Sequence, residues 1–487
     1  MPANFDASRI QQQLRARFRK PFSDAISACE LFSLTLECPG LQLQNLPPLP
    51  APYLYRARPD RGFQQLGLGE AWRTTTAGAQ RFDTLSRALR RLERNWHRER
   101  QPGSADPSPG VFCALAFAAD DPMTKCWEGL PNSILFVPRF LLRCKAGRSS
   151  LTFTCRGVEL QQADTLLSSW SALIEVLQQA ISTAAQADTE HSPQVLRVTP
   201  QTDPAWTETV HRAIRSIESG QLDKVVAARR VRLQASRPFQ ASGILARLAR
   251  LYPSCQLLAI NLGGSTVVSA TPEQLATLGN RTIRCDALGG TTGRAQESGQ
   301  DLQLTLRLLN CRKAQHEHAL VVNSIQSALA PLCRKLIPPD SPEVVKLRNL
   351  QHLWTSIKGT LRNGVGLLDA ARRLHPTPAV AGTPTDAACQ WLQEHEDLAR
   401  GWYSGIVGWL QLNGDGELSV LLRCAVLQGR SAELFAGAGI VANSDPEAEL
   451  QETEIKLHAM LEAMLASTEQ AATPLANTQA GRQARHS

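Results

Sequence analysis

Three apolar runs between residues 405 and 441 give the clearest pattern along the chain. The runs GIVGWLQL, GELSVLLRCAVL and AELFAGAGIV are separated by NGDG at 413–416 and by Gly429-Arg430. Steps of this kind favour the positive-φ turns that close hairpins, so the pattern predicts a three-stranded antiparallel meander. Alternating side chains of the second run are apolar on both faces, and we expect the sheet to be covered on both sides. Arg423 would then lie on a buried strand face.

Helices are predicted beside this sheet over residues 301–332 and 444–467. Asp445 suits the N-cap of the second helix, and Pro446 suits its first turn. Helices mixed with antiparallel strands indicate an α+β fold. Before residue 187, apolar runs alternate with turn-forming stretches, and the polar segment 187–204 is predicted to be a connector. Residues 468–487 have too few apolar side chains to fold and are predicted to be a disordered tail.

The composition excludes several classes of protein. With 487 residues, 43% of them hydrophobic and 20% charged, the chain can bury a large core and is neither disordered nor a small disulfide-stapled domain. Its 12 cysteines form no CxxC pair, which favours buried thiols in a reducing compartment over zinc ribbons. No apolar stretch approaches the roughly 20 residues that cross a bilayer, and no secretion signal opens the chain. We therefore expect a cytoplasmic protein without membrane contact.

The positive charge is concentrated near the N-terminus. The net charge is +8, and residues 1–100 carry 16 Lys and Arg against 9 Asp and Glu, most densely at 15–20 and 87–100. These runs would suit a nucleic-acid module or the solvated face of an Arg-rich helix. Few aromatic residues are interleaved for base stacking, so the helix face is favoured and nucleic-acid binding is not expected.

Glu317 lies in a helical segment that contains His316-Glu317-His318. The two histidines are spaced i, i+2 and point in different directions on a helix, so the segment is not a zinc motif. Leu320 and Val321 follow Glu317 at i+3 and i+4 and place it on an apolar stripe. Two interpretations remain open: a buried carboxylate that is paired, protonated or metal-bound, or a carboxylate at the edge of the stripe that reaches solvent.

A second carboxylate face follows Pro446. Glu449, Glu452 and Lys456 share one helix face, which is ordinarily a solvent-exposed salt-bridge row. The same face continues with Ala459 and Met460, so these carboxylates are predicted to face a cleft.

Two glutamates on separate helices, without Cys or His in ligand register, suit a hard cation such as Mg²⁺. Arg423 requires an anionic partner, and the glycine-rich backbone of AGAGIV at 436–441 permits close approach of a ligand. These features together predict a site for a small acidic molecule held by Mg²⁺ and arginine.

Four separated motifs resemble those of the chorismate-binding enzymes, in family order. They are KAQHEHALVV at 313–322, LHPTPAVAGTP at 374–384, RGWYSGIVGWL at 400–410 and LFAGAGIVANSDPEAELQETEIKL at 434–457. The family includes isochorismate synthase, salicylate synthase and the first components of anthranilate and aminodeoxychorismate synthases. The resemblance runs from about residue 206 to 465, and LHPTPAV is similar to the isochorismate synthase branch.

The resemblance implies one large α+β fold of antiparallel sheets packed as a sandwich, with helices outside. Residues 1–200 would be a divergent N-terminal part that contributes strands to this fold, and residues 201–467 would be the catalytic region. The implied activity is an Mg²⁺-dependent isomerase that converts chorismate to isochorismate for siderophore, salicylate or menaquinone synthesis, without a glutamine amidotransferase partner. The alternatives are a salicylate synthase, which also eliminates pyruvate, and an inactive basic paralogue that binds nucleic acid or acts as a scaffold.

The resemblance also implies roles for individual residues. Lys224, in DKVVAAR, looks like the general base that activates water, and Glu273, in ATPEQL, looks like the general acid. Glu317 and Glu452 would bind Mg²⁺. The substrate site would be lined by Gly290, Tyr403, Arg423, Gly437, Ala438, Gly439 and Lys456. The chain departs from the family pattern at Gly289, usually Ala, and at Ala314, usually Asp, but it retains the base and the carboxylates, which favours an active enzyme.

Overall fold

The computed structural model describes residues 6–39, 41, 43, 49–101, 109–184, 195–200, 203–338, 341–346 and 350–465. The predicted tail at 468–487 lies outside them. The strands are β1 Leu31–Glu37, β2 Tyr53–Arg58, β3 Phe63–Thr76, β4 Trp96–Arg100, β5 Gly110–Leu115, β6 Ser133–Lys145, β7 Arg148–Cys155, β8 Val195–Pro200, β9 Lys224–Ala235, β10 Gln256–Asn261, β11 Thr266–Thr271, β12 Gln274–Gly279, β13 Thr282–Gly293, β14 Cys333–Ile337, β15 Glu343–Lys346, β16 Leu350–Leu361, β17 Gly382–Thr383, β18 Ile406–Gln411, β19 Gly416–Val420, β20 Cys424–Gln428 and β21 Ser431–Ile440. The α-helices are α1 Ala7–Phe18, α2 Asp24–Ser27, α3 Arg81–Asn95, α4 Ala163–Ala184, α5 Asp203–Glu218, α6 Ala241–Leu251, α7 Ser298–Asn310, α8 Arg312–Leu329, α9 Leu367–Leu374, α10 Thr385–His395 and α11 Pro446–Met464.

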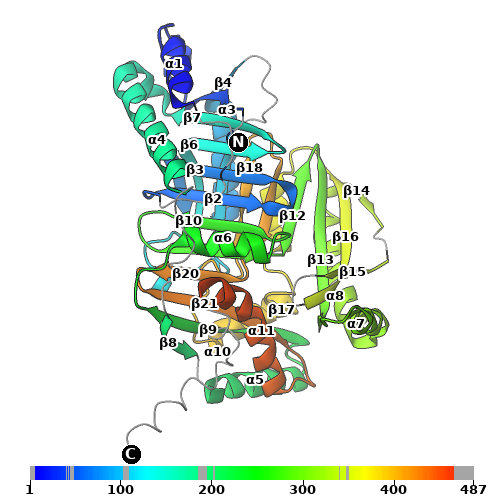
Figure 1. Cartoon of the computed structure of the whole chain (residues 1–487). Coiled ribbons are helices and arrows are strands. Elements are labelled where there is room, and N and C mark those ends of the chain that lie inside the picture. Colours follow the sequence, from blue (N-terminus) through cyan, green and yellow to red (C-terminus); the bar gives the residue numbers. More distant parts are fainter. Residues whose placement is uncertain are drawn as a thin grey trace, which may run out of the picture.

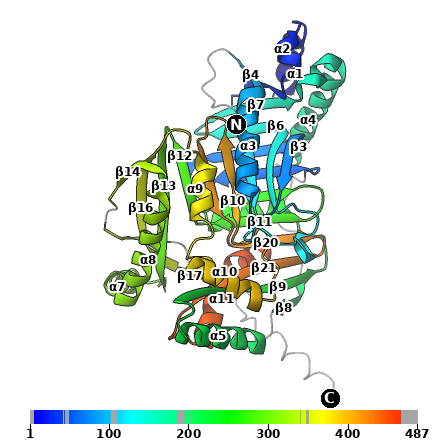
Figure 2. The same cartoon turned by 180° about the vertical axis from the view of Figure 1, so that it is seen from behind.

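Strand layers pack face to face with helices on the outside. The core between the layers is rich in aromatic residues, including Phe112, Phe136 and Phe435. On one outer face, α1, α4, α6 and α11 pack against the sheet, and on the other α3, α8, α9 and α10 do so (Figures 1 and 2). Helix α5 lies at one end of the molecule and contacts α11. The described strand ladders are antiparallel except for β1 with β4. The α+β sandwich predicted from the sequence is confirmed.

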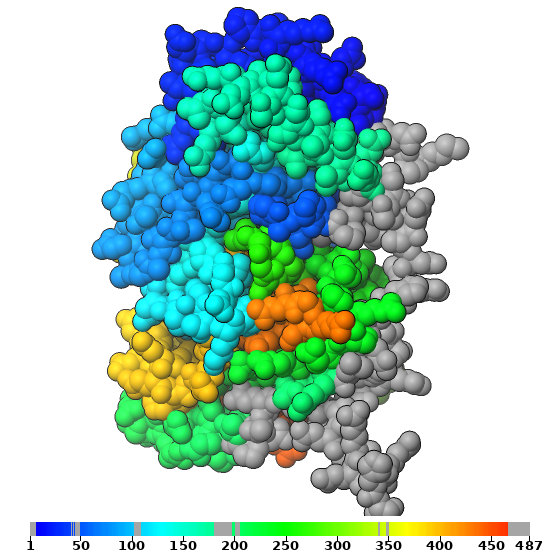
Figure 3. Space-filling model, turned by 90° about the vertical axis from the view of Figure 1, so that its left-hand side faces the viewer, coloured from blue at the N-terminus to red at the C-terminus, as the bar shows by residue number. Residues whose placement is uncertain are grey.

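Strands from the first 200 residues pair directly with strands from the rest of the chain. β2 pairs with β10, and β5 pairs with β18. Helix α1 packs against α4 at one end of the molecule, where Figure 3 shows the two in contact. The domain boundary at residue 200 stays a prediction, although strand pairing crosses it.

The predicted three-stranded meander is wrong in its middle run, which forms two strands, β19 and β20. The break falls at Leu421-Leu422-Arg423, and Arg423 has a φ of +46°. Ser269 Oγ donates to the carbonyl of Leu422 (2.7 Å), and the amide of Ala270 donates to that of Arg423 (3.1 Å). These bonds from β11 satisfy backbone groups that leave the ladder. Arg423 therefore lies at a break between strands rather than on a strand face.

Two other element predictions also need correction. The helix predicted over 301–332 is two helices, α7 and α8, separated at Cys311, which has an extended backbone. The side chain of Gln315 donates to the carbonyl of Leu309 (2.6 Å) and so satisfies a group at the end of α7. The predicted connector 187–204 contains β8, because its backbone pairs with β9 along Val231–Ala235.

The cysteines form no disulfide bonds. All 12 are free, and nine of them are buried. Among the described residues, no helix is both long and apolar enough to cross a membrane. The N-terminal basic runs are partly neutralised, since Arg17 pairs with Glu99 (2.6 Å) and Arg91 with Glu30 (2.8 Å).

Candidate active site

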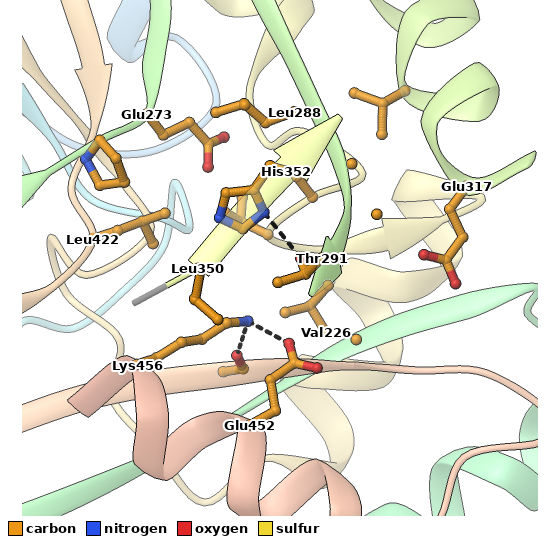
Figure 4. A pocket seen from close by; sticks show the side chains of 18 of the residues that line it. Val226, Glu273, Leu288, Thr291, Glu317, Leu350, His352, Leu422, Glu452 and Lys456 are labelled. Atoms are coloured by element: carbon orange, nitrogen blue, oxygen red, sulfur yellow. Dashed lines mark hydrogen bonds and ion pairs between the residues drawn. The ribbon is translucent and has the colours of Figure 1, made fainter. Parts of the chain in front are cut away.

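A cavity of about 490 Å³ lies where β9, β13, β16, β21, α8 and α11 converge, beside the break between β19 and β20. Figure 4 shows polar side chains from several of these elements around it. The structure brings together, along this cavity, all but one of the site residues predicted from sequence, namely Lys224, Glu273, Gly290, Glu317, Tyr403, Arg423, Gly437, Gly439, Glu452 and Lys456.

Ala438 is the exception. Side chains alternate along β21, so Gly437 and Gly439 face the cavity while the methyl group of Ala438 is fully buried in the core, in the cluster that contains Val225 and Ala227. Ala438 therefore contributes no side chain to the cavity.

Lys224 is the first residue of β9 and is partly buried in the cavity wall. Burial lowers the pKa of its ammonium group, and the nearby charge of Lys456 lowers it further, whereas the carboxylates of Glu317, Glu452 and Glu449 act in the opposite direction. The net pKa is lowered, which increases the fraction of neutral amine. Lys224 is thus suited to accept a proton.

Glu273 lies at the corner between β11 and β12. Its amide donates to Thr271 Oγ1 (3.3 Å), and its carbonyl accepts from the amide of Val420 (3.1 Å). Hydrogen bonds on both sides of the residue therefore hold its backbone in place. Burial raises the pKa of its carboxyl to about 7, with Asp286 adding to the rise and Lys456 and Lys224 opposing it. A carboxyl group in this environment keeps a proton near neutral pH and can donate it.

Glu452 and Lys456 form an ion pair on one face of α11. Lys456 Nζ lies 2.7 Å from Glu452 Oε1 and 2.8 Å from the carbonyl of Gly437, which ties the helix to β21 (Figure 4). Burial acts to raise the pKa of Glu452, but the ion pair outweighs it and the pKa is lowered. The N-cap bond from the amide of Ala448 to Asp445 (2.9 Å) begins α11 as predicted.

Glu317 reaches the cavity from α8, on a different side from Glu452 (Figure 4). Its side chain is 29% exposed and lies 4.0 Å from Lys313 Nζ. The predicted apolar stripe is only half correct, because Val321 is buried but Leu320 is 38% exposed. Glu317 therefore lies at the edge of the stripe and borders a cavity open to solutes.

The family resemblance implies a divalent cation, and the donors present fit one. Among the described residues, no three His, Cys, Asp or Glu side chains gather as a complete ligand cluster. Mg²⁺ needs only one or two protein carboxylates, with water and substrate oxygens completing its shell, and Glu317, Glu449 and Glu452 line one cavity. Burial raises the pKa of Glu449, and neighbouring Glu452 adds to the rise. A bound cation would relieve this crowding of negative charge.

Arg423 and Tyr403 line the cavity near the strand break. No ion pair to Arg423 is found among the described residues, and its guanidinium lies 6.0 Å from the centre of the Tyr252 ring, which leaves it able to meet an anionic ligand. Tyr403 is buried, stacks on Phe435 with ring centroids 5.3 Å apart, and has its pKa raised chiefly by burial. A Cβ atom on Gly437 would lie 3.2 Å from Tyr403 Oη. Glycine at 437 therefore keeps space beside the phenol.

Gly290 sits in a β-bulge where β13 passes α8. Its φ is +70°, and a Cβ atom there would lie 2.9 Å from Cβ of Ala314. The departures from the family pattern at Gly289 and Ala314 therefore lie at or next to this contact. The small side chain at 314 leaves room for the bulge.

Sequence reasoning missed His352, which lines the cavity from β16. Its Nδ1 lies 3.0 Å from Thr291 Oγ1, and burial lowers its pKa to about 4, with Arg423 and Lys456 acting in the same direction. The ring is therefore neutral at physiological pH. Only the alternating apolar pattern of the surrounding strand marked this position in the sequence, and that pattern does not reveal a cavity.

Replacing Gly439 by alanine is expected to lower kcat about 10²-fold without unfolding the protein. A Cβ atom at 439 would lie 2.7 Å from Cε of Lys224, so the lysine must move away, and displacing a reacting group by about 1 Å can cost this much. Steady-state kinetics and a thermal melt test the prediction. Gly264→Ala is the control, since nothing lies within 4 Å of its Cβ position. Equal kcat values for the two variants would contradict the argument.

The sandwich fold, with a lysine of lowered pKa, a carboxyl of raised pKa and oxygen donors around one cavity, is typical of an enzyme that acts on a small anionic molecule. A family model described as chorismate binding enzyme matches residues 27–465. The chain belongs to the chorismate-binding enzyme family.

Two curated relatives cover most of the chain. The isochorismate synthase MenF of Bacillus subtilis is 30% identical over 83% of this chain and 86% of its own length. The salicylate biosynthesis isochorismate synthase of Pseudomonas aeruginosa is 32% identical over 85% of each. The solved structure of the menaquinone-specific isochorismate synthase of Escherichia coli is 26% identical, covers 94% of this chain and 100% of its own, and superposes with a TM-score of 0.77. The chain is therefore similar to isochorismate synthases within its family.

Proposed function

We propose that the protein is an isochorismate synthase, an isomerase that converts chorismate to isochorismate. The observation that carries the proposal is a pair of groups with opposite pKa shifts on one cavity. The pKa of Lys224 is lowered and that of Glu273 is raised to about 7. The lowered pKa makes the amine of Lys224 a better proton acceptor, and the raised pKa lets the carboxyl of Glu273 hold a proton that it can donate, as an exchange of hydroxyl groups on a ring requires.

The proposed reaction balances without any further reactant. Water attacks one ring carbon of chorismate and gives a proton to Lys224, the conjugated double bonds shift, and the bond from another ring carbon to its hydroxyl breaks. Glu273 donates a proton to the departing hydroxyl, which leaves as water. One water enters and one leaves, so the product is an isomer. Solvent then gives a proton to Glu273 and takes one from Lys224.

The other cavity residues would hold the substrate. Chorismate carries two carboxylates, for which Arg423 and Lys456 supply positive charge, and the glycine backbone of β21 allows close approach. Glu317 and Glu452 would hold Mg²⁺, which supplies positive charge to steady the ring carboxylate as electrons redistribute. Tyr403 closes the wall next to Gly437.

A product assay tests the proposed function. Purified protein incubated with chorismate and Mg²⁺ is expected to form isochorismate, resolved from chorismate by liquid chromatography. Fluorescent salicylate formed without an added lyase would identify a salicylate synthase instead. Anthranilate or aminodeoxychorismate formed from ammonia would place the enzyme in an amidotransferase-partnered branch, and absence of turnover would contradict the proposal.

Glu452→Gln is expected to raise the Mg²⁺ concentration at half-maximal activity at least tenfold. The amide keeps a hydrogen-bond acceptor for Lys456 but removes the negative charge that would bind the metal. An Mg²⁺ titration of activity, together with Mg²⁺ binding by calorimetry, provides the measurement. Glu447→Gln is the matched control, because Glu447 lies on the same helix, is exposed and does not line the cavity. An unchanged titration for Glu452→Gln would exclude it as a ligand.

We also propose that the enzyme works in the cytoplasm and without a glutamine amidotransferase subunit, as the sequence predicts. Several relatives are named for menaquinone, salicylate or vibriobactin synthesis, and all of these are called isochorismate synthases. The proposed product therefore suits any of these pathways. Cell fractionation and size-exclusion chromatography of the native protein test the location and the absence of the subunit.

A further inference from the structure

A buried ion pair between Glu396 and Arg400 lies just outside the cavity. The two side chains are 5% and 3% exposed, and they meet through two bonds, from Arg400 Nε to Glu396 Oε1 (2.6 Å) and from Nη2 to Oε2 (2.7 Å). The guanidinium also lies 4.4 Å from the centre of the Phe117 ring. Burying such a pair is costly unless its remaining donors and acceptors are satisfied. Their partners therefore indicate what the pair does.

Those partners are backbone groups of the strand that begins with Lys224. Arg400 Nη2 donates to the carbonyl of Val226 (2.7 Å), and the amide of Ala228 donates to Glu396 Oε2 (2.9 Å). One edge of β9 pairs with β21 throughout this region. On the other edge, β17 pairs with Lys224 and Val225, and β8 pairs from Val231 onward. The ion pair fills the interval and takes the place of a missing strand.

Arg400 also contacts two other segments of the cavity wall, one through its side chain and one through its backbone. Arg400 Nη1 donates to the carbonyl of Val380 (2.9 Å), and the carbonyl of Arg400 accepts from the amide of Tyr403 (2.9 Å). Val226, Val380 and Tyr403 all line the cavity, whereas neither member of the ion pair does. Any effect of the pair on a bound substrate must therefore pass through the segments that it holds.

We infer that Glu396 and Arg400 are positioning residues that fix the start of β9, so that Lys224 is held against the substrate. The inference rests on the proposed role of Lys224 as the base. One residue, Val225, separates Lys224 from the residue whose carbonyl Arg400 binds. Short β17 is the only strand that pairs with the outer edge of β9 at Lys224 in the described part of the chain. Loss of the pair leaves this edge with unpaired backbone groups and frees the strand end to move.

Glu396→Gln tests the inference, because it keeps the shape of the side chain and removes its charge. Amide hydrogen exchange of peptides covering residues 224–229 is expected to accelerate at least tenfold relative to the unchanged protein. Chorismate turnover is expected to show kcat reduced about 10- to 100-fold, with KM changed less than threefold, because the base acts in the transition state. The exchange measurement needs no substrate, so it can fail or succeed independently of the proposed function.

Glu433→Gln is the matched control. Glu433 is also buried and pairs with Arg230 and Arg232 on β9 (2.6 Å to Arg232), but at the end of the strand that is remote from Lys224. Its variant is expected to lower stability without accelerating exchange at residues 224–229 or changing kcat. Equal effects of the two variants on that peptide and on kcat would overturn the inference. If Glu396→Gln yields no folded protein, Arg400→Lys replaces it. Lysine keeps the charge but lacks the planar guanidinium that donates to the carbonyls of Val226 and Val380.

A double variant separates positioning from general damage. If the pair acts through Lys224, adding Glu396→Gln to Lys224→Ala is expected to change the residual rate less than twofold. A further 10- to 100-fold loss in that background would show that the pair acts elsewhere and would overturn the inference.

Discussion

Lys224→Ala is expected to reduce kcat about 10²- to 10⁴-fold, the usual contribution of a positioned general base, while chorismate still binds. Alanine removes the amine that would take the proton from water. Lys456, Arg423 and the glycine backbone remain to hold the substrate. Steady-state kinetics give the rate, and calorimetry with chorismate and Mg²⁺ gives the affinity.

Lys145→Ala is the control for this variant. Lys145 is exposed at the hairpin between β6 and β7 and does not line the cavity, so its removal is expected to leave the rate unchanged. A Lys224→Ala enzyme with the normal rate would remove Lys224 from the mechanism, and with it the inference about the ion pair that holds its strand.

Glu273→Gln is expected to cause a loss of similar size, about 10²- to 10⁴-fold in kcat. Glutamine fits the corner between β11 and β12 and keeps the backbone bonds to Thr271 and Val420, but it has no acidic proton to give to the departing hydroxyl. Glu343→Gln is the control, because Glu343 is exposed on β15 and does not line the cavity. Normal turnover by Glu273→Gln would refute its role as the acid.

The pH dependence follows from the raised pKa of Glu273, about 7 in the free enzyme. In the proposed mechanism the protonated form is the active one, so kcat/KM is expected to fall as pH rises through about 7, about tenfold per unit beyond it. Lys224 would act in its neutral form, so its protonation is expected to lower the rate on the acid side. A kcat/KM profile of the unchanged enzyme with no alkaline fall would contradict the assignment of Glu273.

Much of the candidate site could be predicted because its residues lie in local patterns. The i, i+3 and i+7 spacing of Glu449, Glu452 and Lys456 places them on one helix face in any fold, and the Asp445 cap fixes where that helix begins. Glu317 was recognised on a helix in the same way. Lys224 and Glu273 were assigned as the proposed base and acid only through their resemblance to family motifs, since a lysine on a strand and a glutamate after proline have no chemical signature of their own.

Other features depend on contacts between distant segments and have no local signature. The break at Arg423 is held by bonds from β11, and the alternation that turns Ala438 into the core is fixed by the pairing of β21 with β9. The split between α7 and α8 is stabilised by a side chain on the following helix.

By itself, the sequence determined the α+β class, the start and the carboxylate face of α11 and the family, because periodicity, capping and motif spacing act over a few residues. Only the tertiary structure decided that Lys224, Glu273, Glu317 and Glu452 share one cavity and that a buried ion pair completes the edge of β9. Both outcomes depend on long-range strand pairing. The burial that this pairing creates lowers the pKa of Lys224 and raises the pKa of Glu273.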